Sequence, residues 1–129
     1  MAAKKGISRE VFAGDPAIAG LVRALKVGDT IYVSGTTAFE DGVTPPDDMA
    51  AQMRLTYCKI QQALAHFGGG MADVVEQTVF VTDMAAALAA RHVRGEVYGE
   101  TLPASATVEV SGLGRSGLKV EIKVTARLG

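Results

Sequence analysis

The stretch KVEIKVTAR, residues 119–127, alternates between charged or polar residues and apolar ones. Successive side chains of a β-strand point to opposite faces of the sheet. One face of this strand would therefore carry only apolar side chains: Val120, Ile122, Val124 and Ala126. The other face would carry Lys119, Glu121, Lys123, Thr125 and Arg127. This pattern is typical of a sheet that is covered on one face and polar on the other.

Other strands are predicted upstream of this one. PASATVEV (103–110) begins at a proline, and VVEQTVFVTD (74–83) is rich in β-branched residues. The continuous apolar run TVFV predicts burial on both faces. TIYVSGTTA (30–38) also has a strand composition, and LVRALKV (21–27) fits a strand or a helix. The turn Gly28-Asp29 between them favours a hairpin, and residues 8–13 could add a further short strand.

Two helices are predicted between the strands. After a loop at 40–48, Asp47 or Asp48 can cap a helix of about 20 residues that ends at the glycines 68–70. Its apolar residues recur every three or four positions on one face: Ala50, Met53, Tyr57, Ile60, Leu64 and Phe67. The opposite face carries Gln52, Arg54, Lys59 and Gln62. Asp83 can cap a second helix from about Met84 to Gly99, with Leu88 and Val97 as core contacts.

The predicted order is therefore β-β-α-β-α-β-β over a single domain, residues 1–129. Strands and helices in this order predict an α+β fold: a two-layer sandwich with one mixed sheet and two helices on one face. Since both helices cover the same face, the other face of the sheet must be solvated or shared with a partner.

Composition narrows the classes of function. The net charge is −1, with 13 Lys and Arg against 14 Asp and Glu. The sequence therefore lacks the excess of basic residues that is typical of proteins that bind nucleic acid. No apolar run is long enough to span a membrane, and the N-terminal segment is too polar for a signal peptide. A single cysteine, Cys58, favours the reducing cytoplasm. His66 and His92 have no zinc-ligand spacing, and we expect no metal and no cofactor.

Four segments in this order resemble a known family: VGDTIYVSGT (27–36), ADVVEQTVFVTDM (72–84), VYGETLPASATVEVSGL (97–113) and VEIKVTA (120–126). They are similar to the Rid family of YjgF-like proteins, the reactive-intermediate enamine/imine deaminases. The resemblance implies a chorismate-mutase-like fold. It also implies a homotrimer whose sheets form a central barrel, with a cleft for a small-molecule ligand between each pair of subunits.

The resemblance further implies a chemistry. In the family, an arginine in a P-A-R-S motif pairs with the carboxylate of a 2-imino or 2-enamino acid. A glutamate of the last strand holds a water that attacks the C=N carbon, and ammonia and a 2-keto acid are formed. Glu121 matches that glutamate, and Ser34 and Gly35 match a motif that lines the cleft.

The sequence departs from the family pattern at the arginine that binds the substrate carboxylate, which we call the carboxylate anchor. Its P-A-R-S motif reads Pro103-Ala104-Ser105-Ala106, so Ser105 replaces the arginine beside Ala104. A family tyrosine near the N-terminus is replaced by Leu21. Arg23, and Arg91 in place of a family asparagine, are candidates for a relocated anchor. A neutral hydrogen bond contributes less than a charge-assisted pair, so Ser105 predicts weaker carboxylate binding.

Each of these residues also has a structural interpretation. Glu121 could belong to a solvated Lys-Glu-Lys face, Ser105 could simply be tolerated in a strand, and both arginines could be surface charges. The sequence leaves three enzyme or binding functions open: an enamine/imine deaminase, a diverged enzyme of hydrolysis or elimination, and a non-catalytic binding trimer. An endoribonuclease is disfavoured by the nearly neutral charge.

Overall fold

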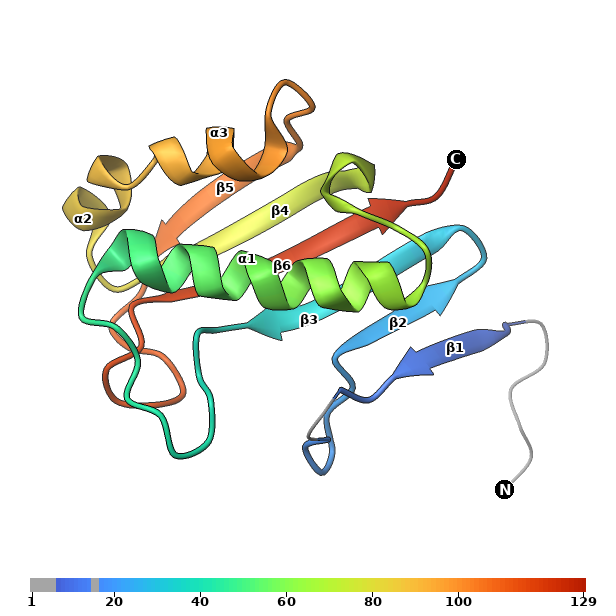
Figure 1. The fold of residues 1–129 in the computed structure, drawn as a ribbon, viewed down its shortest axis with the longest axis horizontal. Helices are drawn as coiled ribbons and strands as arrows, with labels where there is room; N and C mark the ends of the chain where they lie inside the picture. Colours follow the sequence, from blue (N-terminus) through green and yellow to red (C-terminus); the bar gives the residue numbers. More distant parts are fainter. Residues whose placement is uncertain (1–6, 15–16) are drawn as a thin grey trace.

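The computed structural model describes residues 7–14 and 17–129. One six-stranded sheet has the order β1-β2-β3-β6-β4-β5. All neighbouring strands are antiparallel except β4 and β5, which are parallel (Figure 1). The strands are β1 (Arg9–Phe12), β2 (Ala24–Val27), β3 (Thr30–Thr36), β4 (Val74–Val81), β5 (Ala104–Glu109) and β6 (Val120–Arg127).

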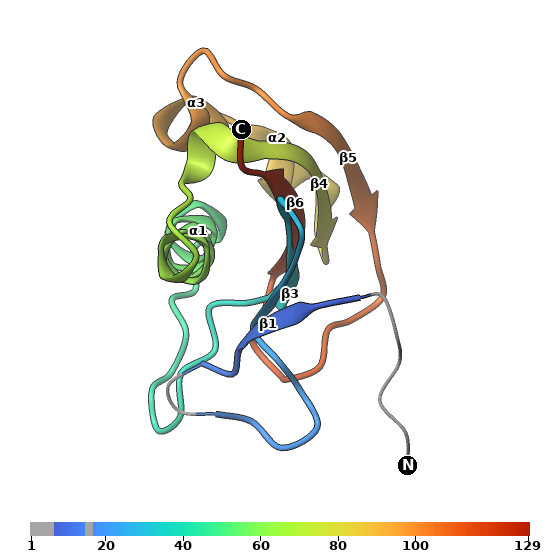
Figure 2. The same ribbon diagram turned by 90° about the vertical axis from the view of Figure 1, so that its right-hand side faces the viewer.

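The helices form a second layer on one face of this sheet (Figure 2). They are α1 (Met49–His66), the single 3₁₀ turn η1 (Met71–Asp73), α2 (Met84–Ala89) and α3 (His92–Tyr98). The predicted α+β two-layer fold with a mixed sheet is confirmed. The opposite face of the sheet has no helix of the described residues over it, and we refer to it as the bare face.

The predicted hairpin is present. Thr30 pairs with Val27 and Tyr32 with Leu25 across the turn. Gly28 has φ +58°, in the left-handed region that a glycine enters without steric cost. The first strand of the hairpin begins at Ala24 rather than at residue 21. The optional N-terminal strand is also present as β1, which pairs with β2 at the edge of the sheet.

The alternating pattern of the last strand is confirmed in β6. Its four apolar residues are buried in the core beneath the helices, and they alternate with exposed or half-buried polar residues. On β4, Val79 and Val81 are buried, whereas Thr78 and Phe80 are only half-buried on the bare face. The predicted burial of TVFV on both faces was therefore only half right.

The first helix begins after Asp48, whose carboxylate accepts a hydrogen bond from the amide of Ala51 at 2.9 Å. Most of its predicted apolar face is buried. The placement of Gln52 on the solvent face was wrong, because its side chain is fully buried. Its amide donates to the carbonyls of Pro46 and Gly117, and its oxygen accepts from the amide of Lys119. Gln52 thus satisfies backbone groups of two loops that meet beside α1.

The second helical segment is divided into α2 and α3 by a turn at Ala90 and Arg91. Asp83 caps α2 as predicted, by accepting from the amide of Ala86. Leu88 was wrongly expected in the core, since it is 57% exposed. The turn instead brings Ala90 and Val93 inward, where both are buried.

No helix of the described residues is long and apolar enough to cross a membrane. Within the same part of the chain, His, Cys, Asp and Glu side chains form no group of three that could hold a metal ion.

Candidate active-site residues

Glu121 and Gly35 lie against each other on the bare face. Glu121 follows the buried Val120 in β6 and pairs with Phe80 of β4, so its side chain points away from the helices. Gly35 stands in the neighbouring strand β3, beside a register irregularity. A Cβ atom built on Gly35 would come within 2.7 Å of Oε2 of Glu121. The absence of a side chain at residue 35 therefore makes room for the carboxylate.

Ser34 stands next to this pair, but its hydroxyl is already in use. Its Oγ donates to the carbonyl of Val22 at 2.6 Å, and its amide donates to the carbonyl of Arg23 at 3.0 Å. The serine thereby ties β3 to the chain segment before β2. Its oxygen can still accept a hydrogen bond from a ligand.

Ser105 lies on the other face of the sheet. It pairs with Gln77 of β4, whose side-chain amide donates to the Ser105 hydroxyl at 3.0 Å. Gln77 in turn accepts from the hydroxyls of Tyr57 on α1 and Tyr98 on α3, at 2.7 and 2.8 Å. Ser105 therefore faces the helices, while Glu121 of the same chain faces away from them. Ala104, one residue earlier, is exposed and by alternation shares the bare face.

The two tyrosines make this polar cluster part of the core. Burial is the largest cause that raises the pKa of both phenols above the ordinary value of 10.0, and both hydroxyls stay protonated at neutral pH. Every polar atom in the chain Tyr57–Gln77–Tyr98 has a partner. Gln77 was not identified from the sequence, where it stands between apolar residues of a predicted strand. A glutamine in such a buried strand is itself a signal of a hydrogen-bond network.

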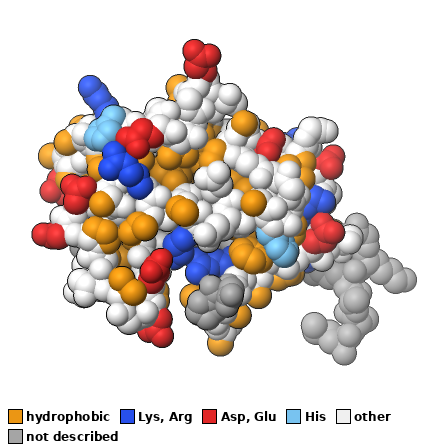
Figure 3. Space-filling view, in the orientation of Figure 1, with side chains coloured by type: hydrophobic (Ala, Val, Ile, Leu, Met, Phe, Trp, Pro, Cys, Tyr) orange, Lys and Arg blue, Asp and Glu red, His pale blue; other side chains and the backbone are white. Residues whose placement is uncertain are grey.

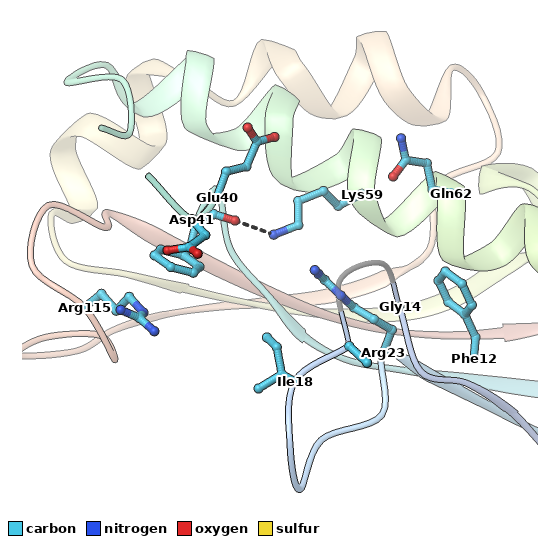
Figure 4. Close-up of a pocket in the computed structure, with 11 residues that line it drawn as sticks. Phe12, Gly14, Ile18, Arg23, Glu40, Asp41, Lys59, Gln62 and Arg115 are labelled. Carbon is cyan, nitrogen blue, oxygen red and sulfur yellow. Dashed lines mark hydrogen bonds between the residues drawn. The ribbon is translucent and has the colours of Figure 1, made fainter. Parts of the chain in front are cut away.

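Arg23 lies in a different cavity, between α1 and the segments before β2 and after β3 (Figure 4). The cavity has a volume of about 680 Å³. Arg23 and Lys59 point toward one another in it, and Arg115 lies at its other end with its guanidinium 3.9 Å from the ring centre of Phe39. Figure 3 shows Lys and Arg side chains gathered in the lower middle of this helix-bearing face. Arg23 is thus on the helix side of the sheet, away from Glu121.

Lys59 in this cavity has a structural role. Its ammonium donates to the carbonyls of Thr37 and Phe39, at 2.8 and 2.9 Å, and so holds the segment after β3 against α1. Burial, and then the nearby charge of Arg23, lower the pKa of Lys59 below its ordinary value. The sequence placed Lys59 on the solvent face of the helix, whereas it is half-buried.

Arg91 stands at the start of α3 and lines a smaller pocket of about 250 Å³. The pocket lies between α1, the two short helices and the strands β4 and β5. Arg94, one turn further along α3, lines it too, and its Nη2 donates to the hydroxyl of Thr107 on β5 at 2.6 Å. Arg94 was not singled out from the sequence. Its spacing of three residues from Arg91, which places both on one helix face, was the available signal.

Similar proteins are known for most of this chain. A family model described as Endoribonuclease L-PSP matches residues 13–128. The 3-aminoacrylate deaminase RutC of Acinetobacter baylyi is 32% identical over 115 residues, which cover 88% of this chain and 90% of that protein. The chain belongs to the YjgF, or Rid, family. The mitochondrial protein mmf2 of Schizosaccharomyces pombe is 31% identical over 106 residues, covering 81% of this Rid chain and 84% of mmf2.

A solved structure agrees with this membership. The crystal structure of Rv2704 from Mycobacterium tuberculosis, described as a member of the YjgF/YER057c/UK114 family, superposes with a TM-score of 0.83. The sequences are 32% identical, and the match covers 94% of this Rid chain and 100% of Rv2704. The predicted family and fold class are both confirmed.

This Rid chain presents its candidate residues on two separate surfaces. Glu121, Gly35 and Ala104 belong to the bare face, whereas Ser105 and Arg91 belong to the helix side. The candidate anchors Ser105, Arg23 and Arg91 all lie on the helix side, whereas Lys123 shares the bare face of β6 with Glu121. A site that combines Glu121 with one of these candidate anchors would therefore need a second subunit.

Proposed function

We propose that this protein is a Rid-type deaminase that hydrolyses a small enamine or imine carrying a carboxylate. The observation that supports this most is the position of Glu121, whose carboxylate occupies the space left by Gly35 at the surface of the bare face. A half-buried carboxylate on the bare face, held against a residue without a side chain, is suited to general base catalysis. Glu121, Ser34 and Gly35 also match the residue types of the family motifs.

The proposed reaction needs no cofactor. Glu121 takes a proton from water as the water oxygen bonds to the imine carbon, and a carbinolamine forms. Protonation of its nitrogen and cleavage of the C–N bond release ammonia, while the hydroxyl proton is lost and a carbonyl remains. An enamine first takes a proton on carbon to become the imine. The sum is imine plus water giving a 2-keto acid plus ammonia.

The active form is proposed to be a homotrimer. Because Glu121 and Ser105 face opposite sides of one sheet, they can face a common ligand only across a subunit interface. A ligand cleft would then combine the bare face of one copy with the β5 region of the next. The substrate class follows from the name of a relative, since 3-aminoacrylate, the substrate named for RutC, is an enamine with a carboxylate. The free, exposed Cys58 is compatible with action in the cytoplasm.

The test generates imines in situ with an amino-acid oxidase and follows their decay with and without the protein. Glu121→Gln should lower the rate of catalysed decay by about 100-fold or more, because general base catalysis is worth that much. Arg54→Gln, on α1 of the helix layer, is the control and should retain the rate. Full activity of Glu121→Gln would contradict the proposal.

A non-catalytic binding trimer is the second candidate, favoured by the absence of a charge at Ser105. It predicts that the wild-type protein binds 2-keto acids but does not accelerate imine decay. RNA cleavage, which the family description suggests, is not supported by a protein of net charge −1.

A further inference from the structure

A positive charge lies over β5 close to Ser105, but it is supplied by Arg94 of α3 and not by the strand itself. Thr107 shares the helix-side face of β5 with Ser105, and its hydroxyl accepts a hydrogen bond from Arg94 at 2.6 Å. The guanidinium of Arg94 therefore lies directly over β5. Arg94 of α3 thus places a guanidinium on the same face of β5 as Ser105, two residues further along the strand.

The guanidinium of Arg94 has unused hydrogen-bonding capacity. It carries five N–H donors, and one of its nitrogens donates to Thr107. The ion pairs among the described residues do not include Arg94 or Arg91. Arg54 gives the contrast, because it donates two hydrogen bonds to the carboxylate of Glu96 at 2.9 and 2.8 Å. Arg94 is held in place and half-buried, yet no carboxylate of the described chain neutralises it.

The pocket around Arg94 has the composition of a site for a small carboxylic acid. Arg91 brings a second cation from the start of α3. The remaining wall is mostly apolar, with Met53 and Val79 from the core and Leu88 at the rim. A volume of about 250 Å³ lies below the range of pockets for drug-sized ligands. Leu88 is an exposed apolar residue that a ligand's side chain would cover.

We propose that Arg94, supported by Arg91, is the carboxylate anchor of this protein. The ligand is a small monocarboxylate with a short aliphatic side chain, such as a 2-keto or 2-imino acid. The fork of Arg94 binds the carboxylate in a bidentate pair, and the apolar wall contacts the side chain. The inference rests on the proposed function in one respect: the reacting carbon would meet Glu121 of a neighbouring subunit.

The inference is tested by calorimetric titration with pyruvate, 2-oxobutanoate and 2-oxopentanoate. The wild type should bind them, and Arg94→Gln should weaken binding by about tenfold to 100-fold, the usual loss for a charge-assisted pair. Arg94→Lys should recover part of the affinity, since it keeps the charge but not the fork. Arg54→Gln is the matched control, and its affinity should be unchanged. Butanone, which lacks a carboxylate, should not distinguish wild type from Arg94→Gln.

A rescue separates an anchor from a merely structural arginine. In the Arg94→Gln background, Ser105→Arg restores a guanidinium to the same face of β5, and binding should recover at least about tenfold. Thermal melts and sedimentation of each variant check that the fold and assembly are retained. If Arg94→Gln folds and binds as tightly as the wild type, or if the wild type binds no 2-keto acid, the inference is overturned.

The outcomes for the anchor and for the chemistry are separable. Binding that depends on Arg94 without any imine hydrolysis would support the anchor and refute the deaminase. Imine hydrolysis that depends on Glu121 but has the same KM in Arg94→Gln would support the deaminase and refute the anchor. A KM that rises in Arg94→Gln with little change of kcat is the result expected if both hold.

Discussion

At the scale of single residues, the candidate site depends on the absence of a side chain at Gly35. Its backbone has no positive φ, so an alanine there is not strained. The atom that an alanine methyl would meet at 2.7 Å is Oε2, at the flexible end of Glu121. We therefore expect Gly35→Ala to fold normally, but to displace the carboxylate and lower imine hydrolysis by about tenfold to 100-fold.

The same imine-decay assay checks this, together with a thermal melt. Gly112→Ala is the matched control, because a Cβ at Gly112 meets no atom within 4 Å and its φ is not positive. Equal rates for Gly35→Ala and Gly112→Ala would mean that the position of the Glu121 carboxylate does not matter to the reaction.

Gln52 leads to a prediction about stability. Gln52→Leu leaves the carbonyls of Pro46 and Gly117 and the amide of Lys119 without their partner. Pro46 and Lys119 are half-buried and Gly117 is exposed, so water can replace part of the lost hydrogen bonds. We therefore expect the free energy of unfolding to fall by about 1–3 kcal/mol, the cost of one buried group left unpaired. Urea denaturation measures this. Gln61→Leu, at an exposed position of the same helix, should change it by less than about 0.5 kcal/mol.

At the scale of elements, the cluster of Tyr57, Tyr98 and Gln77 joins α1, α3 and β4. Both phenols have a pKa raised above 10.0 by burial. The unfolded chain releases these protons as the pH passes about 10, whereas the folded chain keeps them, so the free energy of unfolding falls as the pH rises further. Below that pH both states are protonated, and the contribution of the cluster is constant.

Urea midpoints between pH 8 and pH 11 test this linkage. Tyr98→Phe should make the alkaline fall shallower, because it removes one of the two phenols whose pKa is raised by burial. Lys59 acts in the opposite direction, because its pKa is lowered and its contribution to stability rises toward pH 10.5. The comparison is therefore made between variants. Identical slopes for the wild type and Tyr98→Phe would refute the role of burial.

The elements themselves could largely be predicted, and the exceptions have physical causes. Apolar residues alternate with polar ones in 119–127, and they recur every three or four residues after Asp48. Each pattern predicts an element with one buried face, and both predictions were confirmed. The division of α2 from α3 could not be read locally, because the turn at Ala90 and Arg91 contains neither a glycine nor a proline that would mark it. Gln52 was misplaced for a similar reason, since its partners include residues 65 and 67 positions away.

At the scale of the whole molecule, sequence motifs identified candidate residues but not their relation to one another. Ser105 and Glu121 both come from strands near the C-terminus, and nothing in their spacing shows that they face opposite sides of one sheet. That relation follows from the registers on β4, where Ser105 pairs with Gln77 on the helix side and Glu121 pairs with Phe80 on the bare face. Arg94 lies over β5 because α3 belongs to the crossover between the parallel strands β4 and β5, and the sequence motifs did not show this crossover.

The bare face gives the last prediction, which concerns assembly. Val108 on β5 pairs with Phe80, is 41% exposed, and by alternation lies on the opposite face from Thr107. If this face is packed against neighbouring copies in a homotrimer, sedimentation should give three times the monomer mass of 13.4 kDa. Val108→Asp then buries a charge at the interface and should shift the protein toward monomers.

Leu55→Asp serves as the control for this assembly, because Leu55 is an exposed apolar residue of α1 on the helix layer, and its charge should leave the mass unchanged. The monomeric Val108→Asp protein should keep its secondary structure and yet lose imine hydrolysis, since Glu121 and Arg94 of one chain cannot reach a common ligand. A wild-type monomer at micromolar concentration would refute the trimer. Full hydrolysis by a Val108→Asp monomer would refute the shared cleft, and the reaction would then have to be explained by the residues of one face alone.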